Sequence, residues 1–145
     1  ATTLEQVLAA RQEYPADSYL LQSYIVPTML GSQPAWFRVF YCAGEVYPCW
    51  WHPMTHVYAS VAPAEESDHR LAPLHDMTME IARICGLDLF STEIALRPEG
   101  TFVVVDYVND PIDLRLQSKA ADGVPDRIVR EIVERLVGLV AGHRR

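Results

Sequence analysis

The sequence predicts an α+β fold in which an antiparallel sheet has helices packed on one side. Two pairs of apolar, β-branched segments are each joined by a short turn, as in β-hairpins. Single segments with helical spacing stand before, between and after these pairs, without the strand–helix alternation of a parallel sheet. Half of the 145 residues are hydrophobic and 21% are charged, so we expect one globular domain over residues 1–145.

The chain begins with a helical pattern and a strand-like segment. Leu4, Val7 and Leu8 stand at helical spacing, which predicts a short helix ending near Gln12. Residues 19–26 are rich in aromatic and branched side chains and end at Pro27, which predicts a strand.

The first expected hairpin joins residues 37–42 to residues 45–50 through Ala43-Gly44. Pro48 lies inside its second strand, which indicates an edge strand or a bulge, because proline cannot donate to a ladder. A further short strand is expected at residues 56–60.

Two helices are expected in the second half of the chain. The first runs from about Leu71 to Ile84 and stops at Gly86, after an acidic loop over residues 62–68. The last begins after Pro125 and carries one apolar stripe: Ile128, Val129, Ile132, Val133, Leu136, Val137 and Val140.

The second expected hairpin carries two acids. Residues 91–97 and 101–108 flank a presumed two-residue turn at Glu99-Gly100, and this register places Glu93 opposite Asp106. Opposed carboxylates repel each other, so the arrangement indicates a positive group between them, with a hard divalent cation as the leading candidate. A slip of one residue would instead set Glu93 against Val105 and place the acids on opposite faces.

Composition excludes several classes of function. The net charge of −7 leaves no basic stripe for nucleic acid, and Lys119 is the single lysine. The three cysteines have no metal-finger spacing and no run is long and apolar enough to cross a membrane, so we expect a soluble, cytoplasmic protein.

The order of these pieces resembles the carboxyl-terminal, magnesium-binding half of the ATP-grasp domain. Residues 20–27 (LLQSYIVP) are similar to the hinge strand of that family, here residues 19–27, and residues 37–46 are similar to its arginine-bearing hairpin. GLDLFSTE, which ends at Glu93, and VDYVN, which ends at Asn109, resemble its metal-binding hairpin, here residues 88–110.

The resemblance implies roles for particular residues. Backbone groups near Gln22, Tyr24 and Ile25 would meet adenine, and Arg38 would lie at the phosphates as the catalytic arginine. The metal ligands would be Glu93, Asp106 and Asn109, holding one or two Mg²⁺ ions together with ATP.

The implied reaction is that of an ATP-dependent carboxylate–amine or carboxylate–thiol ligase, which forms an acyl-phosphate from a small carboxylate substrate. On this view, loss of Glu93 or Asp106 weakens Mg–nucleotide binding and stabilises the free fold by relieving repulsion.

Two departures from the family pattern concern the site. Ser23 stands where the family commonly has an acid in the hinge strand. Two residues separate Asp106 from Asn109 where the family usually has one, so either a bulge re-aims Asn109 or Asp110 takes its place.

A third departure concerns the extent of the chain. The half with the lid and phosphate-binding lysines is not contained in it, so we expect a fragment of a longer ATP-grasp chain that is inactive alone.

Other residues carry weaker hypotheses. Arg115 and Lys119 are candidate contacts for an anionic substrate, and the stripe of the last helix could pair with a second subunit or the missing half. His52 and His56 have the spacing of a zinc pair, but Pro53 and the lack of a third ligand disfavour such a site. Two other functions remain open: a non-catalytic binding or assembly module, and an ATP-grasp phosphotransferase.

Overall fold

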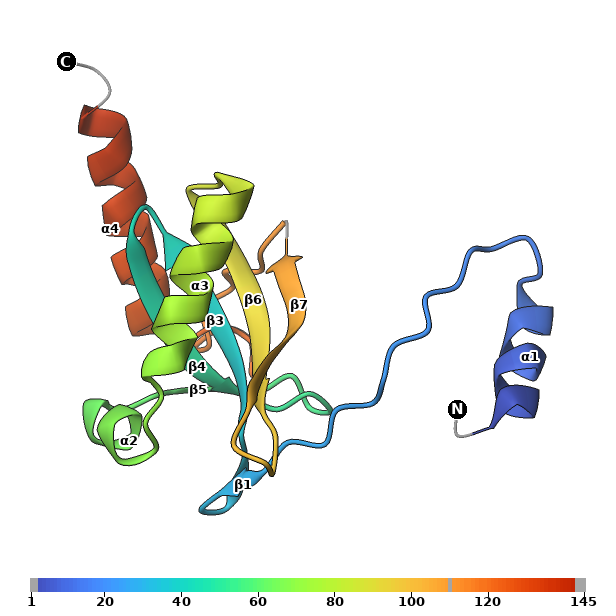
Figure 1. Cartoon of the computed structure of the whole chain (residues 1–145). Coiled ribbons are helices and arrows are strands. Elements are labelled where there is room, and N and C mark those ends of the chain that lie inside the picture. Colours follow the sequence, from blue (N-terminus) through green and yellow to red (C-terminus); the bar gives the residue numbers. More distant parts are fainter. Residues whose placement is uncertain (1–2, 110, 143–145) are drawn as a thin grey trace.

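A five-stranded antiparallel sheet forms the centre of the molecule, with strand order β5-β4-β3-β6-β7 (Figure 1). The structure is a computed structural model that describes residues 3–109 and 111–142. The predicted α+β class with an antiparallel sheet is confirmed. The sheet strands are β3 (Trp36–Cys42), β4 (Glu45–Trp51), β5 (Tyr58–Ser60), β6 (Leu89–Leu96) and β7 (Phe102–Asn109).

The hairpin of β3 and β4 forms as expected and has a regular register. Its pairs run without interruption from Phe37 opposite Trp50 to Cys42 opposite Glu45. Ala43 and Gly44 both have positive φ, 45° and 92°, as a tight two-residue hairpin turn requires. The guanidinium of Arg135 donates to the carbonyl oxygen of Ala43 at 2.6 and 2.9 Å, which fixes this turn to the last helix.

Pro48 stands on the part of β4 that β5 does not cover. β5 pairs only with residues 49–51 of β4, so residues 45–48 form an open edge within the described chain. A proline on such an edge costs no ladder hydrogen bond, which agrees with the sequence expectation for this position.

The two long helices pack on opposite faces of the sheet (Figure 1). Helix α3 (Ala72–Cys85) covers the face that carries Phe37 and Val39, and helix α4 (Asp126–Gly142) covers part of the face that carries Phe40 and Cys42. The expectation of helices on one side therefore differs from the structure. The reason lies in β3, whose alternate side chains are apolar and buried on both faces, so that each face needs its own cover.

The segment from residue 62 to residue 68 is helical, although the sequence predicted an acidic loop there. Pro63 begins helix α2 (Pro63–Asp68), and the Glu65 carboxylate accepts a hydrogen bond from the Ala62 backbone N–H at 2.8 Å. Proline at a first helical position and an acid in the first turn both favour a helix start.

The first helix lies apart from the sheet (Figure 1). Helix α1 (Leu4–Glu13) buries no residue, and a small hairpin of β1 (Met29–Leu30) and β2 (Gln33–Pro34) follows. The predicted strand at residues 19–26 is wrong, because residues 18–28 form no strand. Strand propensity requires a partner edge to pair with, and this segment has no backbone ladder to any described strand.

Candidate functional site

The second hairpin changes register twice, and the candidate site lies where it does so. Near the loop, Leu96 faces Phe102 and Ile94 faces Val104. The register then shifts, so that Glu93 faces Asp106, and shifts again before Ser91 faces Asn109. The opposition of Glu93 and Asp106 is therefore confirmed, although the predicted turn is not.

The loop of this hairpin has three residues, 98–100, instead of the two expected. The Arg97 N–H donates to the Thr101 carbonyl oxygen at 3.0 Å, and the Gly100 N–H donates to the Arg97 carbonyl oxygen at 2.9 Å. Gly100 takes a φ of +83°, the positive-φ glycine typical of a three-residue hairpin loop. If the register set by this loop continued unchanged along the strands, Glu93 would face Val105. The first bulge shifts the register by one residue, so that Glu93 faces Asp106.

The second bulge places Asn109 on the face of the two acids. One residue separates Ser91 from Glu93 on β6, whereas two residues separate Asp106 from Asn109 on β7, so β7 holds the extra residue. Directly opposed residues share a face, so Glu93, Asp106 and Asn109 lie on the same side of the sheet. The bulge is the device expected for re-aiming Asn109, whereas the alternative ligand, Asp110, lies outside the described residues.

Strand β3 brings an arginine to the same place. Arg38 pairs with Glu93 across β3 and β6, and its Nη1 lies 2.7 Å from Glu93 Oε1. The two side chains are only 16% and 13% exposed. Trp36 Nε1 donates to the other oxygen, Glu93 Oε2, at 3.2 Å. The positive group that the opposed acids require is thus supplied to Glu93 by the protein itself.

Aromatic side chains surround the guanidinium of Arg38. Its Cζ lies 5.2 Å from the centre of the Trp51 ring, within the range of a cation–π contact. Burial raises the pKa of the nearby Tyr58, an effect that the Arg38 guanidinium opposes. On strand alternation, Trp36, Arg38 and Trp51 belong to the same face as the acids.

Asp106 differs from Glu93 in having no partner for its carboxylate. Within residues 3–109 and 111–142 that carboxylate makes no hydrogen bond or ion pair, and only the Asp106 carbonyl oxygen is used, by Thr92 Oγ1 at 2.6 Å. Asn109 Nδ2 is likewise buried without a hydrogen-bond partner among these residues. The cluster therefore carries one uncompensated negative charge and a half-buried amide.

The donor set of this cluster fits a hard cation. Two carboxylates and an amide carbonyl offer the oxygen ligands that Mg²⁺ prefers. The described residues contain no group of three His, Cys, Asp or Glu side chains placed to hold a metal, so the third protein ligand of such a site must be the amide of Asn109.

The polar loop after β7 gives Arg115 two carboxylate partners. Arg115 lies 2.7 Å from Asp113 and 2.8 Å from Asp122, and it holds the pKa of both carboxyls below the ordinary range. Gly123 permits this fold of the loop, because a Cβ there would meet the Arg115 carbonyl oxygen at 2.7 Å. Arg115 thus has its charge compensated within the loop, whereas no described side-chain contact involves Lys119.

The segment expected to meet adenine has one contact with the hairpin. Gln22 Nε2 donates to the Val105 carbonyl oxygen on β7 at 3.1 Å, while Tyr24 is 87% exposed. Ile25 belongs to the same irregular segment. The structure therefore gathers Arg38 and the three proposed ligands, and Gln22 supplies a hydrogen bond from residues 19–27 to β7.

The histidines with zinc spacing lie on a turn beside the site. His52 Nδ1 accepts from the backbone N–H groups of Met54 and Thr55, both at 3.3 Å. His56 stacks on Trp51 with ring centres 5.4 Å apart and planes within 2°. Both imidazoles have contacts other than a shared ligand.

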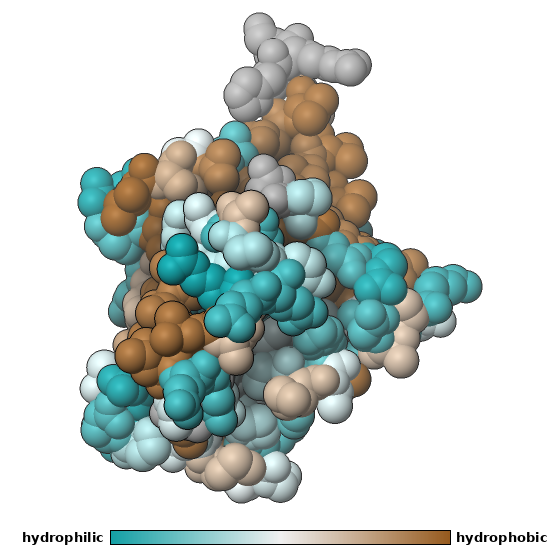
Figure 2. Space-filling model, turned by 90° about the vertical axis from the view of Figure 1, so that its right-hand side faces the viewer, coloured by the Kyte–Doolittle hydropathy of each residue, from teal (hydrophilic) through white to brown (hydrophobic). Residues whose placement is uncertain are grey.

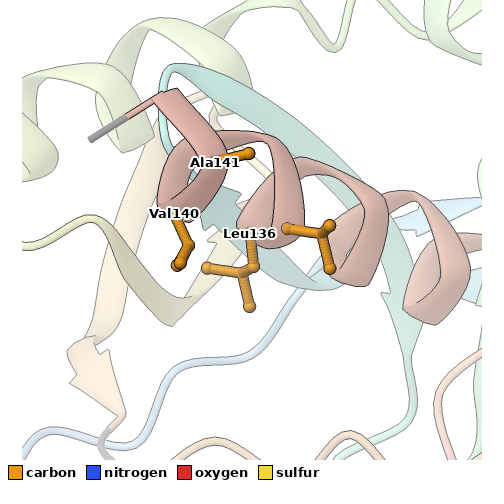
Figure 3. A pocket seen from close by; sticks show the side chains of 4 residues that line it. Leu136, Val140 and Ala141 are labelled. Carbon is orange, nitrogen blue, oxygen red and sulfur yellow. The ribbon is translucent and has the colours of Figure 1, made fainter. Parts of the chain in front are cut away.

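The outer half of α4 presents an apolar surface. Ile128, Val129 and Ile132 are buried, whereas Val137 and Val140 remain 63% and 55% exposed. Leu136 and Val140 project from one side of the helix (Figure 3). Hydrophobic side chains run along this part of the helix below the C-terminal residues (Figure 2).

Sequence reasoning missed the surroundings of Arg38. Alternation along the strand places Trp36 beside Arg38 and could have shown that they share a face. No local signal shows that β3 lies next to β6, which is what brings Arg38 to Glu93.

Comparison of the chain with protein-family models, curated proteins and solved structures gives no match. No helix within residues 3–109 and 111–142 is long and apolar enough to cross a membrane.

Proposed function

We propose that this chain is the magnesium- and nucleotide-binding half of an ATP-dependent carboxylate–amine or carboxylate–thiol ligase of the ATP-grasp kind. The proposal rests on the resemblance of three sequence segments and on one structural observation. The double bulge of β6 and β7 sets Glu93, Asp106 and Asn109 on one face, with Arg38 beside them. Bulges that re-aim side chains are typical of functional sites.

Each residue has a role that follows from its chemistry. Glu93, Asp106 and the amide oxygen of Asn109 would hold one or two Mg²⁺ ions, which stabilise charge on a phosphoryl group in transfer. Arg38 binds phosphate oxygens through its planar fork. Trp36 orients Glu93 through its indole N–H, and the Trp51 ring limits the directions that the guanidinium can take.

A second candidate function is a non-catalytic binding or assembly module. The ion pair between Arg38 and Glu93 favours it, because this pair neutralises one acid without any metal. The exposed stripe of α4 offers such a module an apolar surface for a partner subunit or for a further part of a longer chain. The two functions differ in whether the site binds Mg–nucleotide.

The deciding experiment is a titration of the purified chain with ADP in Mg²⁺ and in EDTA, by calorimetry and tryptophan fluorescence. Trp36 and Trp51 make fluorescence a local reporter, because both contact residues of the site. We expect weak, Mg²⁺-dependent binding that Asp106→Asn weakens at least about tenfold, the scale of losing one charged ligand interaction.

The matched control is Glu99→Gln, an acid in the loop of the same hairpin that pairs with Arg97. It is expected to bind as the unchanged chain does. Absence of any Mg²⁺-dependent binding would favour the assembly module. A crystal structure with Mg²⁺ and a non-hydrolysable ATP analogue should then show the metal within about 2.0–2.2 Å of the proposed ligand oxygens.

A further inference from the structure

Each carboxylate oxygen of Glu93 accepts a hydrogen bond within the protein. Arg38 Nη1 holds Oε1 at 2.7 Å and Trp36 Nε1 holds Oε2 at 3.2 Å. With the Arg38 and Glu93 side chains only 16% and 13% exposed, their ion pair is screened far less by water than a surface pair. A cation that approached Glu93 would therefore meet the charge of Arg38 at close range.

We propose that Arg38 closes the cation site until a polyphosphate draws it away from Glu93, so that metal and polyphosphate bind only together. This inference rests on the proposed function and adds the coupling between its two ligands. Glu93 and Arg38 each exchange one partner: the carboxylate gives up the guanidinium for the metal, and the guanidinium gives up the carboxylate for phosphate oxygens.

The charges of the cluster favour this exchange. With Arg38 on Glu93, the two acids and one guanidinium sum to a single negative charge at Asp106, a weak site for a divalent ion. Once phosphate engages Arg38, both carboxylates face the metal together with the phosphate oxygens. Phosphate neutralises the Arg38 charge that opposed the metal, and the metal neutralises the carboxylate charges that opposed the phosphate. Such coupling is reciprocal.

The surroundings of Arg38 are suited to its second partner. Its Nε is buried and has no hydrogen-bond partner among the described residues, so the guanidinium keeps a donor that Glu93 does not use. Arg38 also lies over the Trp51 ring, a contact that does not require Glu93. Trp36 can continue to hold Glu93 Oε2, which keeps the carboxylate oriented after the arginine has left.

The test measures Mn²⁺ binding without nucleotide, from the electron paramagnetic resonance signal of the free ion. Arg38→Gln removes the charge but can still donate to Glu93, so it is chosen to preserve the fold. We expect it to bind Mn²⁺ at least about tenfold more tightly than the unchanged chain, within the usual range of coupling between sites. Its affinity for ADP in Mg²⁺ should fall, because the phosphates lose their arginine.

Three further variants complete the test. Arg38→Lys keeps the charge and should bind Mn²⁺ as weakly as the unchanged chain, and Arg83→Gln, on the far face of the sheet in α3, should change nothing. Arg38→Met replaces Arg38→Gln if the latter fails to fold, as judged by circular dichroism, and the same gain is expected.

Two results would overturn the inference in distinguishable ways. If the unchanged chain binds ADP in a Mg²⁺-dependent manner but the neutral variants gain no Mn²⁺ affinity, the coupling is wrong and the proposed function stands. If the unchanged chain shows no Mg²⁺-dependent binding of ADP, the proposed function fails and the inference fails with it.

Discussion

The two hairpins of the sheet differ in how regularly their strands pair. β3 and β4 keep one register over their whole length, and their turn is a tight two-residue one. β6 and β7 change register twice within eight residues of each strand. Both hairpins supply core side chains, such as Phe37 and Trp50 from the regular one and Phe90 and Ile94 from the bulged one. The acids and the amide of the candidate site come from the bulged hairpin.

The difference shows how one sheet can serve both stability and chemistry. Regular alternation sends every second side chain to the same face, which suits a core buried on both sides. It cannot place Asp106 and Asn109 on one face, because Asn109 lies an odd number of positions, three, after Asp106 in the chain. A bulge achieves this placement at the cost of one interrupted ladder position.

The largest expected effect lies in the regular hairpin. Phe37→Ala removes a ring that is 0% exposed and packs at 4.7 Å against Trp50, so it should lower the free energy of unfolding by about 3–5 kcal/mol. Urea denaturation followed by circular dichroism measures it. Phe102→Ala, at the start of β7, removes a half-buried ring and should cost clearly less. Equal losses would show that burial does not set the cost at these two positions.

The next effect separates the two acids of the bulged hairpin. Glu93→Ala leaves Arg38 without its carboxylate, so it should destabilise the fold by about 2–3 kcal/mol. This corrects the expectation from sequence that removal of Glu93 relieves repulsion, because Arg38 already provides the relief.

Asp106→Asn should instead stabilise the fold by up to about 0.5 kcal/mol, because Asp106 opposes Glu93 and has no positive partner among the described residues. Both variants are compared by urea midpoint with the unchanged chain. A loss of stability in Asp106→Asn as large as that in Glu93→Ala would show that Asp106 has a stabilising partner.

A smaller effect is expected from removing the second bulge. Deletion of Tyr107, which is 72% exposed, would leave one residue between Asp106 and Asn109 and make the ladder regular at this point. Asn109 should stay opposite Ser91, so Mg²⁺-dependent ADP binding should change less than about threefold, within the context dependence of single contacts. Complete loss of binding would mean that the bulge itself shapes the site.

The smallest effect concerns the loop after the bulged hairpin and depends on pH. Arg115 lowers the folded-state pKa of Asp113 and Asp122. As the pH falls, these two carboxyls therefore become protonated in the unfolded chain at a higher pH than in the folded chain. The resulting stabilisation is complete above about pH 4, the ordinary carboxyl range, and is lost as pH falls through the lower folded values.

Arg115→Ala should therefore lower the thermal midpoint slightly at neutral pH, where the stabilisation is complete, and this difference from the unchanged chain should disappear as pH falls below about pH 4, which flattens the profile. Arg11→Ala, in α1, which buries no residue, serves as the control and should leave the pH profile unchanged. An unaltered profile in Arg115→Ala would show that the two carboxyls do not titrate through Arg115.

Local signals in the sequence were enough for much of the fold. The Ala43-Gly44 turn, the Gly86 stop and the stripe of α4 depend on neighbours in the chain, and each element formed close to the expected bounds. The opposition of Glu93 and Asp106 was also predicted from a local hairpin. The loop has three residues instead of the two expected, and a bulge compensates for the extra residue.

Features that depend on distant parts of the chain were not predictable in this way. The pairing of β3 with β6 joins Arg38 to Glu93, which are 55 positions apart in the chain, and it decides that Arg38 lies on Glu93. Residues 19–26 have the composition of a strand, yet composition does not reveal whether an edge is available for pairing.

Pro48 has a consequence for how copies of this sheet can join. Linear growth of a sheet from chain to chain needs two open edges that can both exchange backbone hydrogen bonds. The β7 edge is an eight-residue strand, whereas the open part of β4, residues 45–48, is short and ends at a proline, which has no amide N–H to donate. Two copies could therefore meet through their β7 edges, but that contact closes on itself and does not propagate into a fibre.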